Sequence, residues 1–139
     1  MSTVLVVDDD LGFLNALEQM LVAEGYRVLR AATGKQAVDV LEKKHHEIDL
    51  IVVDLALPDT NGFELIGAIS RRATPIKVIA TSSVFKDVYL DMAGTLGAHA
   101  SIRKSREGKP FPESQWLATV RRLIGSATNE SAVGVGPGA

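Results

Sequence analysis

Cysteine is absent from the 139-residue sequence, and neither charge sign nor any long apolar run dominates it. Without cysteine the chain can form no disulfide framework, thiolate zinc site or cysteine nucleophile, which is compatible with a reducing compartment. Lys and Arg number 15 against 17 Asp and Glu, so no basic excess indicates direct binding to nucleic acid. No signal peptide is evident, and no apolar run approaches the roughly 18 residues of a membrane span. We therefore expect a cytoplasmic protein without membrane insertion.

Length and composition indicate one globular domain with a short tail. Hydrophobic residues make up 46% of the chain and charged residues 23%, which is typical of a protein with a buried core. Because domains usually contain about 100 to 200 residues, we expect one domain over residues 1–125. Residues 126–139 are rich in Ser, Gly and Ala and have little to bury, so we predict a disordered tail.

Short aliphatic runs recur along the chain with the length of buried strands. Continuous runs of this kind are typical of strands covered on both faces, as in a parallel sheet. The last run is weaker than the others, and the second is more alternating. The runs are residues 4–7, 26–31, 50–53, 76–80 and 98–102.

Apolar residues at helical spacing fill the intervals between these runs. The first helical set is Leu11, Leu14, Leu17 and Leu21, and Gly25 is a plausible left-handed end for that helix. Thr33 and Gln36 have capping-box spacing before the second set, and Trp116 belongs to the apolar stripe of the last. The β-α unit, repeated five times, predicts a doubly wound α/β fold with a five-stranded parallel sheet and helices on both faces.

Polar residues that can act together follow four of the predicted strands. In an open parallel sheet, ligands bind beyond the carboxyl ends of the strands. Two carboxylates about 4 Å apart repel by roughly 4 kcal/mol at an effective dielectric of 20, so an acidic cluster there needs a cation or a raised pKa. Mg²⁺ and a transferring phosphoryl group fit such a cluster beside a hydroxyl and an amine. The residues are Asp8, Asp9, Asp10, Asp54, Thr81, Ser82, Ser83 and Lys104.

Simpler roles exist for each of these residues taken alone. Asp10 lies where a helix N-cap is expected, and Asp54 could be a turn residue before Pro58. Thr81 or Ser82 could cap the next helix, and a single lysine is usually solvated. The occurrence of acid, hydroxyl and amine after four different strands favours a common site.

The motifs of this chain resemble the receiver domain of bacterial two-component response regulators. Residues 4–10, Val-Leu-Val-Val-Asp-Asp-Asp, are similar to the first strand and acidic pair of that family. Residues 54–65, which begin Asp-Leu-Ala-Leu-Pro-Asp and include Asn61-Gly62, are similar to its phosphoacceptor segment. The resemblance covers about residues 3–125 and implies a flavodoxin-like fold with strand order 2-1-3-4-5.

The resemblance implies roles for individual residues of the acidic cluster. Asp54 would accept the phosphoryl group. Asp8, Asp9 and Asp54 would hold Mg²⁺ directly or through water, together with the backbone carbonyl of Ala56. Ser82 would bond a phosphoryl oxygen, because its spacing to Lys104 suits the family, with Thr81 as the alternative.

Two departures from the family pattern affect the second half of the chain. The family lysine falls on Lys104 when counted from Gly97-Ala98, but on Lys109 when counted back from Pro110-Phe111. We favour Lys104 because it directly ends the predicted fifth strand, which makes residues 105–109 an insertion. Ser101 stands where receivers usually carry an aromatic residue that moves inward on phosphorylation, so its effect on coupling stays open.

These residues predict a stand-alone response regulator that is a phosphoacceptor rather than an enzyme. The expected partners are a histidine kinase or histidine phosphotransfer protein and a downstream protein target, and the sequence leaves open whether the chain forms a homodimer. A competing interpretation is a receiver-like interaction scaffold that is never phosphorylated. A third interpretation, a small flavodoxin-like nucleotide binder, is disfavoured because no glycine-rich loop follows the first strand.

Overall fold

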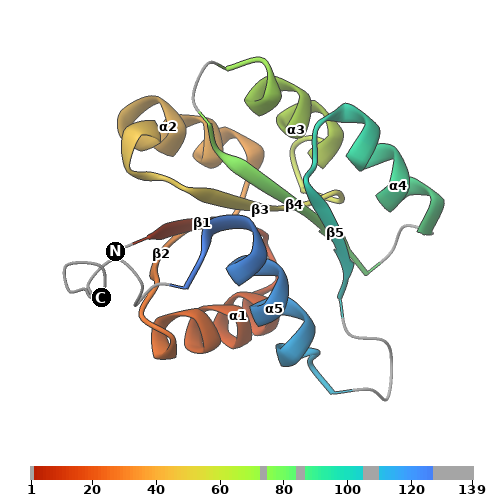
Figure 1. Cartoon of the computed structure of the whole chain (residues 1–139). Helices are drawn as coiled ribbons and strands as arrows, with labels where there is room; N and C mark the ends of the chain where they lie inside the picture. The colour runs from red at the N-terminus through yellow and green to blue at the C-terminus, as the bar shows by residue number, and fades with distance from the viewer. Residues whose placement is uncertain (1, 73–74, 84–86, 105–109, 127–139) are drawn as a thin grey trace.

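The computed structural model describes residues 2–72, 75–83, 87–104 and 110–126, in which five strands alternate with five α-helices (Figure 1). The strands are β1 (Thr3–Val7), β2 (Arg27–Ala31), β3 (Leu50–Asp54), β4 (Lys77–Ser82) and β5 (Ala100–Arg103). The helices are α1 (Leu11–Ala23), α2 (Gly34–Lys44), α3 (Gly62–Ser70), α4 (Asp87–Leu96) and α5 (Glu113–Ile124), with a 3₁₀ turn at His45–Glu47. None of the helices in these ranges is both long and apolar enough to cross a bilayer.

The strands form one parallel sheet in the order β2-β1-β3-β4-β5, which confirms the predicted fold. Every residue of β1 and β3 is buried, as their continuous aliphatic runs predicted. The chain moves from β1 outward to β2 and then back to β3 on the other side of β1. This reversal between β1 and β3 is the point in the sheet where doubly wound proteins place their ligands.

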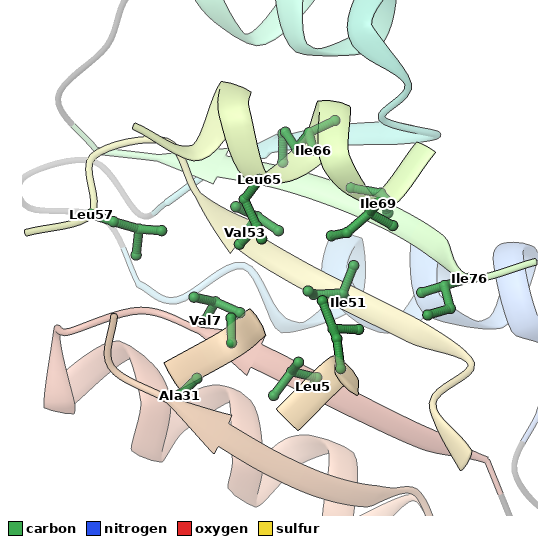
Figure 2. Close-up of a cluster of buried hydrophobic side chains, with 14 of the residues drawn as sticks. Leu5, Val7, Ala31, Ile51, Val53, Leu57, Leu65, Ile66, Ile69 and Ile76 are labelled. Carbon is green, nitrogen blue, oxygen red and sulfur yellow. The ribbon is translucent and has the colours of Figure 1, made fainter. Parts of the chain in front are cut away.

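Alternating side chains of the strands build a hydrophobic core on each face of the sheet. On one face, α2, α3 and α4 cover the sheet, and Figure 2 shows Leu65, Ile66 and Ile69 of α3 above the strand residues Leu5, Val7, Ile51 and Val53. On the other face, α1 and α5 cover Val4, Val6, Leu50, Val52, Ile79 and Ile102. Trp116 of α5 is fully buried in this second core, as predicted.

Two predicted details are wrong at element ends. Leu11 was expected in the buried stripe of α1 but is 67% exposed, because it is the first residue of the helix, while Phe13 is buried instead. The fifth strand begins at Ala100 rather than at residue 98. Gly97 ends α4 with a φ of 127°, and the Ala98 N–H donates to the Ala93 carbonyl, so these residues close the helix.

The predicted helix signals near Gly25 and Thr33 are largely confirmed. Gly25 has a φ of 94° just after α1. The Thr33 hydroxyl accepts the Gln36 N–H at 3.0 Å and caps α2. The Gln36 side chain accepts the N–H of Ala32 at 2.7 Å rather than that of Thr33, so the reciprocal bond of the capping box is shifted by one residue.

His99 joins the beginning of β5 to β4 with both its backbone and its side chain. Its N–H donates to the Val78 carbonyl at 2.7 Å, and its Nδ1 accepts the Val78 N–H at 3.0 Å. Because Nδ1 must be unprotonated to accept, the bond requires the neutral ring with its proton on Nε2. Partial burial, together with the positive charge of Lys77, lowers the pKa of His99 below its ordinary value.

The lowered pKa of His99 predicts a loss of stability in mild acid. The unfolded chain takes up a proton at this residue near its ordinary pKa of 6.5, before the folded protein does. The stabilisation is therefore complete above pH 6.5 and is lost as the pH falls through the lowered value. Urea unfolding at pH 8 and pH 5.5 should show a smaller acid-induced drop in midpoint for His99→Gln than for the wild type.

The exposed His46 provides the matched control for this measurement. His46→Gln should keep the full drop of the wild type between the two pH values. Equal drops in the wild type and His99→Gln would show that the Val78 bond contributes nothing to the pH dependence.

Candidate functional site

Asp8 is a buried carboxylate directly after β1. The Asp8 N–H donates to the Ala31 carbonyl of β2 at 2.9 Å, so the ladder continues one residue past the strand. Its Oδ1 accepts the Asp10 N–H at 2.9 Å, and the residue has no exposed surface. Asp10 accepts the Phe13 N–H at 3.2 Å and is the N-cap of α1, while Asp9 between them is exposed. The sheet ladder and the start of α1 therefore hold Asp8 in place.

Asp54 is the last residue of β3 and lies at the same edge of the sheet. Asp54 Oδ1 accepts the Ala56 N–H at 3.0 Å, and Asp54 is 5% exposed. The next N–H, of Leu55, donates to the Thr81 carbonyl of β4 at 2.9 Å. These bonds fix both the carboxylate and the beginning of the loop that follows it.

Lys104 directly follows β5, and its ammonium lies between the two buried carboxylates. Lys104 Nζ is 2.6 Å from Asp8 Oδ2 and 3.4 Å from Asp54 Oδ2, and the side chain is 7% exposed. The ammonium also lies 4.6 Å from the ring centroid of Phe13, within range of a cation–π contact. Phe13 packs against Phe111 and Trp116 at centroid distances of 6.2 and 5.6 Å, so α1 and α5 form an aromatic support for the lysine.

Burial and the neighbouring charges both shift the pKa values of Asp8 and Lys104. Burial raises the pKa of Asp8 to about 6, and the Asp54 charge adds to this, although hydrogen bonds from Lys104 and the Asp10 N–H favour the carboxylate. Burial of Lys104 opposes its charge, but the hydrogen bond and charge of Asp8, with those of Asp54, outweigh it and hold the pKa of Lys104 above its ordinary value. The site is therefore an acidic pair whose repulsion one lysine offsets.

The carboxylates of Asp8, Asp9 and Asp54 have the arrangement of a cation site. Each offers one oxygen, and these three oxygens lie within 4.8 Å of one another. Two of the carboxylates are buried and Asp9 is exposed, so the cluster is open to solvent on one side. An all-oxygen donor set with room for water suits a hard divalent cation such as Mg²⁺.

The register of β3 and β4 keeps both candidate hydroxyls near Asp54. Thr81 pairs with Asp54 on the neighbouring strand, is fully buried, and its hydroxyl has no partner among the described residues. Ser82 is also fully buried and is one residue closer to the strand end. Because side chains alternate, Thr81 lies on the α1 and α5 face with Asp54, and Ser82 lies on the α4 face.

Only one of the two departures from the family pattern lies among the residues that the structure describes. Residues 105–109, the predicted insertion that includes Lys109, lie outside the described residues. Ser101, at the expected aromatic position, donates from its hydroxyl to the Leu90 carbonyl of α4 at 2.9 Å. A hydrogen bond therefore connects β5 to α4 where an aromatic ring was expected.

Two residues that support the site were not singled out from the sequence. Phe13 contacts Lys104 from a segment distant in sequence, and only its position in the first turn of α1 hinted at this. Gly62 begins α3 against the backbone of Asp54: a Cβ there would lie 2.5 Å from the Asp54 carbonyl oxygen and 2.8 Å from Leu55 Cα. The Gly62 N–H also donates to the Leu55 carbonyl at 3.0 Å. Glycine directly after a cap residue, Asn61, was the available signal.

The site thus combines three carboxylates and a lysine at the carboxyl edge of a doubly wound sheet in the order 2-1-3-4-5. The response regulator receiver domain model matches residues 4–115, and the chain belongs to this family. It is therefore a receiver domain of the kind used in two-component signalling.

Individual relatives agree with this family assignment. Response regulator SaeR of Staphylococcus aureus is 26% identical over 124 residues, which are 89% of this chain and 51% of that protein. The chain thus spans about half the length of the curated relatives it matches. A receiver domain protein of Methanospirillum hungatei has a TM-score of 0.78 at 25% identity, covering 94% of this chain and 98% of its own. The non-phosphorylated HemR receiver domain of Leptospira biflexa has a TM-score of 0.76 at 29% identity, covering 89% and 94%.

The close approach at Gly62 predicts that Gly62→Ala destabilises the protein. The added methyl group would meet backbone atoms, which cannot rotate away, so either β3 or α3 must shift. We expect a loss of about 1 to 3 kcal/mol in the free energy of unfolding, which is usual for overpacking. Gly94→Ala is the control, because no atom lies within 4 Å of a Cβ there and alanine favours a helix. Equal unfolding free energies for Gly62→Ala and the wild type would contradict the close approach.

Proposed function

We propose that this receiver domain accepts a phosphoryl group on Asp54 from a phosphohistidine donor, with Mg²⁺, and signals through protein contacts. The observation that carries the proposal is the buried ammonium of Lys104 between Asp8 and Asp54 beside the exposed Asp9. A structural ion pair alone would need one carboxylate, whereas this site places two buried carboxylates around one lysine and a third, exposed carboxylate beside them.

Four oxygen donors would hold the cation in this proposal. They are the carboxylates of Asp8, Asp9 and Asp54 and the backbone carbonyl of Ala56. The Ala56 N–H is already bonded to Asp54, so the residue that carries this carbonyl is tied to the phosphoacceptor. Bound Mg²⁺ supplies positive charge that offsets the charge on the phosphoryl oxygens.

The transfer exchanges one bond to phosphorus for another. A carboxylate oxygen of Asp54 attacks the phosphorus of the phosphohistidine, the nitrogen–phosphorus bond breaks, and the imidazole leaves with its electron pair. Lys104 is already 3.4 Å from Asp54 Oδ2 and can donate to a phosphoryl oxygen without leaving the site. Catalysis is then mostly positioning and charge neutralisation, as is usual in phosphoryl transfer.

Ser82 is the proposed hydroxyl partner of the phosphoryl group, with Thr81 as the alternative. Ser101 pairs with Ala80 of β4, whose side chain lies in the core on the α4 face. Because side chains alternate along a strand, Ser101 and Ser82 both lie on this face. Ser82 ends β4 beside Asp54, and on its own face of the sheet the Ser101 hydroxyl donates to the Leu90 carbonyl of α4. This placement supports Ser82 as the residue that passes the change to α4 by shifting a population of conformations.

The proposed partners are a histidine kinase or histidine phosphotransfer protein and a downstream protein target, all meeting the chain in the cytoplasm. Neither nucleic acid binding nor an enzymatic activity beyond its own phosphorylation and dephosphorylation is part of the proposal. The alternative, an interaction scaffold that is never phosphorylated, is favoured by one observation, the Ser101 bond in place of the aromatic residue.

Intact mass after incubation with a small phosphodonor tests the proposal. We expect a gain of one phosphoryl group that requires Mg²⁺ and is absent in Asp54→Asn, because asparagine offers no carboxylate nucleophile. If folded protein that binds Mg²⁺ gains no mass, even from a phosphohistidine protein, the scaffold alternative replaces the proposal.

The same assay decides between the two hydroxyls. Ser82→Ala should slow phosphorylation of Asp54 by about a hundredfold, the usual effect of removing one donor to developing charge. Thr81→Val removes a buried hydroxyl of the same strand at nearly constant volume and should stay close to the wild-type rate. The reverse order of rates would assign the role to Thr81.

A further inference from the structure

The carboxylate of Asp59 reaches from the loop after β3 to the beginning of α2. Asp59 Oδ1 accepts the Gly34 N–H at 2.8 Å, and Oδ2 accepts the Lys35 N–H at 3.0 Å. The two N–H groups, with the Thr33 hydroxyl on the Gln36 N–H, complete the first turn of α2. These bonds lower the pKa of Asp59, so the carboxylate is the form that the contact holds.

Close packing at Gly34 brings the same two segments together. A Cβ on Gly34 would lie 2.5 Å from Cγ2 of Thr60 and 3.4 Å from Asp59 Oδ1. The loop therefore packs closely on the first turn of α2, and a residue without a Cβ at position 34 leaves room for the Thr60 side chain. Hydrogen bonding and packing are independent indications that this contact is specific.

The loop held in this way carries the site at its other end. Residues 55–61 begin directly after Asp54, and Ala56 forms an isolated antiparallel bridge with Asn61 across the loop. The Gly62 N–H closes the base of the loop on the Leu55 carbonyl at 3.0 Å. Asp59 and Thr60 at the distal part are thus connected through a short bridged segment to the Ala56 peptide.

We propose that Asp59 is a positioning residue that holds the Ala56 carbonyl in place for Mg²⁺ by fixing the loop to α2. The inference rests on the proposed function, in which that carbonyl is a cation ligand. Mg²⁺ requires nearly ideal octahedral geometry at about 2.0 to 2.1 Å, so a small shift of one ligand weakens binding. A simpler interpretation is that Asp59 only stabilises the first turn of α2. Substitution of Thr33, which caps the same turn, separates the two interpretations.

Calorimetric titration with Mg²⁺ tests the inference on four proteins: wild type, Asp59→Ala, Asp59→Asn and Thr33→Ala. Asp59→Ala should bind Mg²⁺ about tenfold more weakly, at the lower end of the range for partners of metal ligands. Asp59→Asn keeps one acceptor oxygen and should fall between it and the wild type. Thr33→Ala removes a cap from the same helix without touching the loop, so it should lower the melting temperature and leave Mg²⁺ affinity unchanged.

Gly34→Ala is the second variant and separates helix stability from loop position. Alanine favours the helix, but its methyl group would meet the Thr60 side chain and press on the Asp59 carboxylate. We expect weaker Mg²⁺ binding together with an intact Asp59 carboxylate. Equal affinity in Asp59→Ala and the wild type, or an equal loss in Thr33→Ala, would overturn the inference. Failure of the wild type itself to bind Mg²⁺ would instead remove the proposed function, and the inference with it.

Discussion

One buried ammonium allows the rest of the site to exist. Asp8 and Asp54 are buried carboxylates at the ends of adjacent strands, and their mutual repulsion would oppose folding if nothing offset it. Lys104 reaches both from the end of β5, and the ring of Phe13 supports it from α1. Strands β1, β3 and β5 and helices α1 and α5 thus meet around a single charge.

The sheet order explains why these side chains can meet. β1 and β3 are neighbours although α1, β2 and α2 separate them in sequence, and α1 and α3 pack on opposite faces of the sheet. The ends of both strands are therefore uncovered at the same point. The aliphatic runs of β1 and β3 hold this edge rigidly, since each of their side chains lies in one of two cores. A rigid sheet thus supports a site made of residues at strand ends.

Sequence periodicity predicted the fold class and the edge of the sheet at which Asp8, Asp54 and Lys104 gather. The strand order was predicted from the family resemblance. These predictions succeed because a parallel sheet converts local position, the end of a strand, into spatial proximity. Leu11 was misplaced because helical spacing alone does not show where a helix passes beyond the sheet. Phe13 and Asp59 were not recognised as supports because their contacts join segments far apart in the chain, and no local pattern encodes such pairings. Gly62 had only one local signal, its place directly after a cap residue.

The aromatic support beneath Lys104 includes the single tryptophan of the chain, Trp116. Its indole is fully buried and packs against the same Phe13 ring that contacts the lysine ammonium. Indole fluorescence responds to ring packing, so we expect the emission of this residue to change when the Phe13 ring moves with the ammonium. The protein therefore contains its own optical probe of the site, which requires no label and receives no competing signal from a second tryptophan.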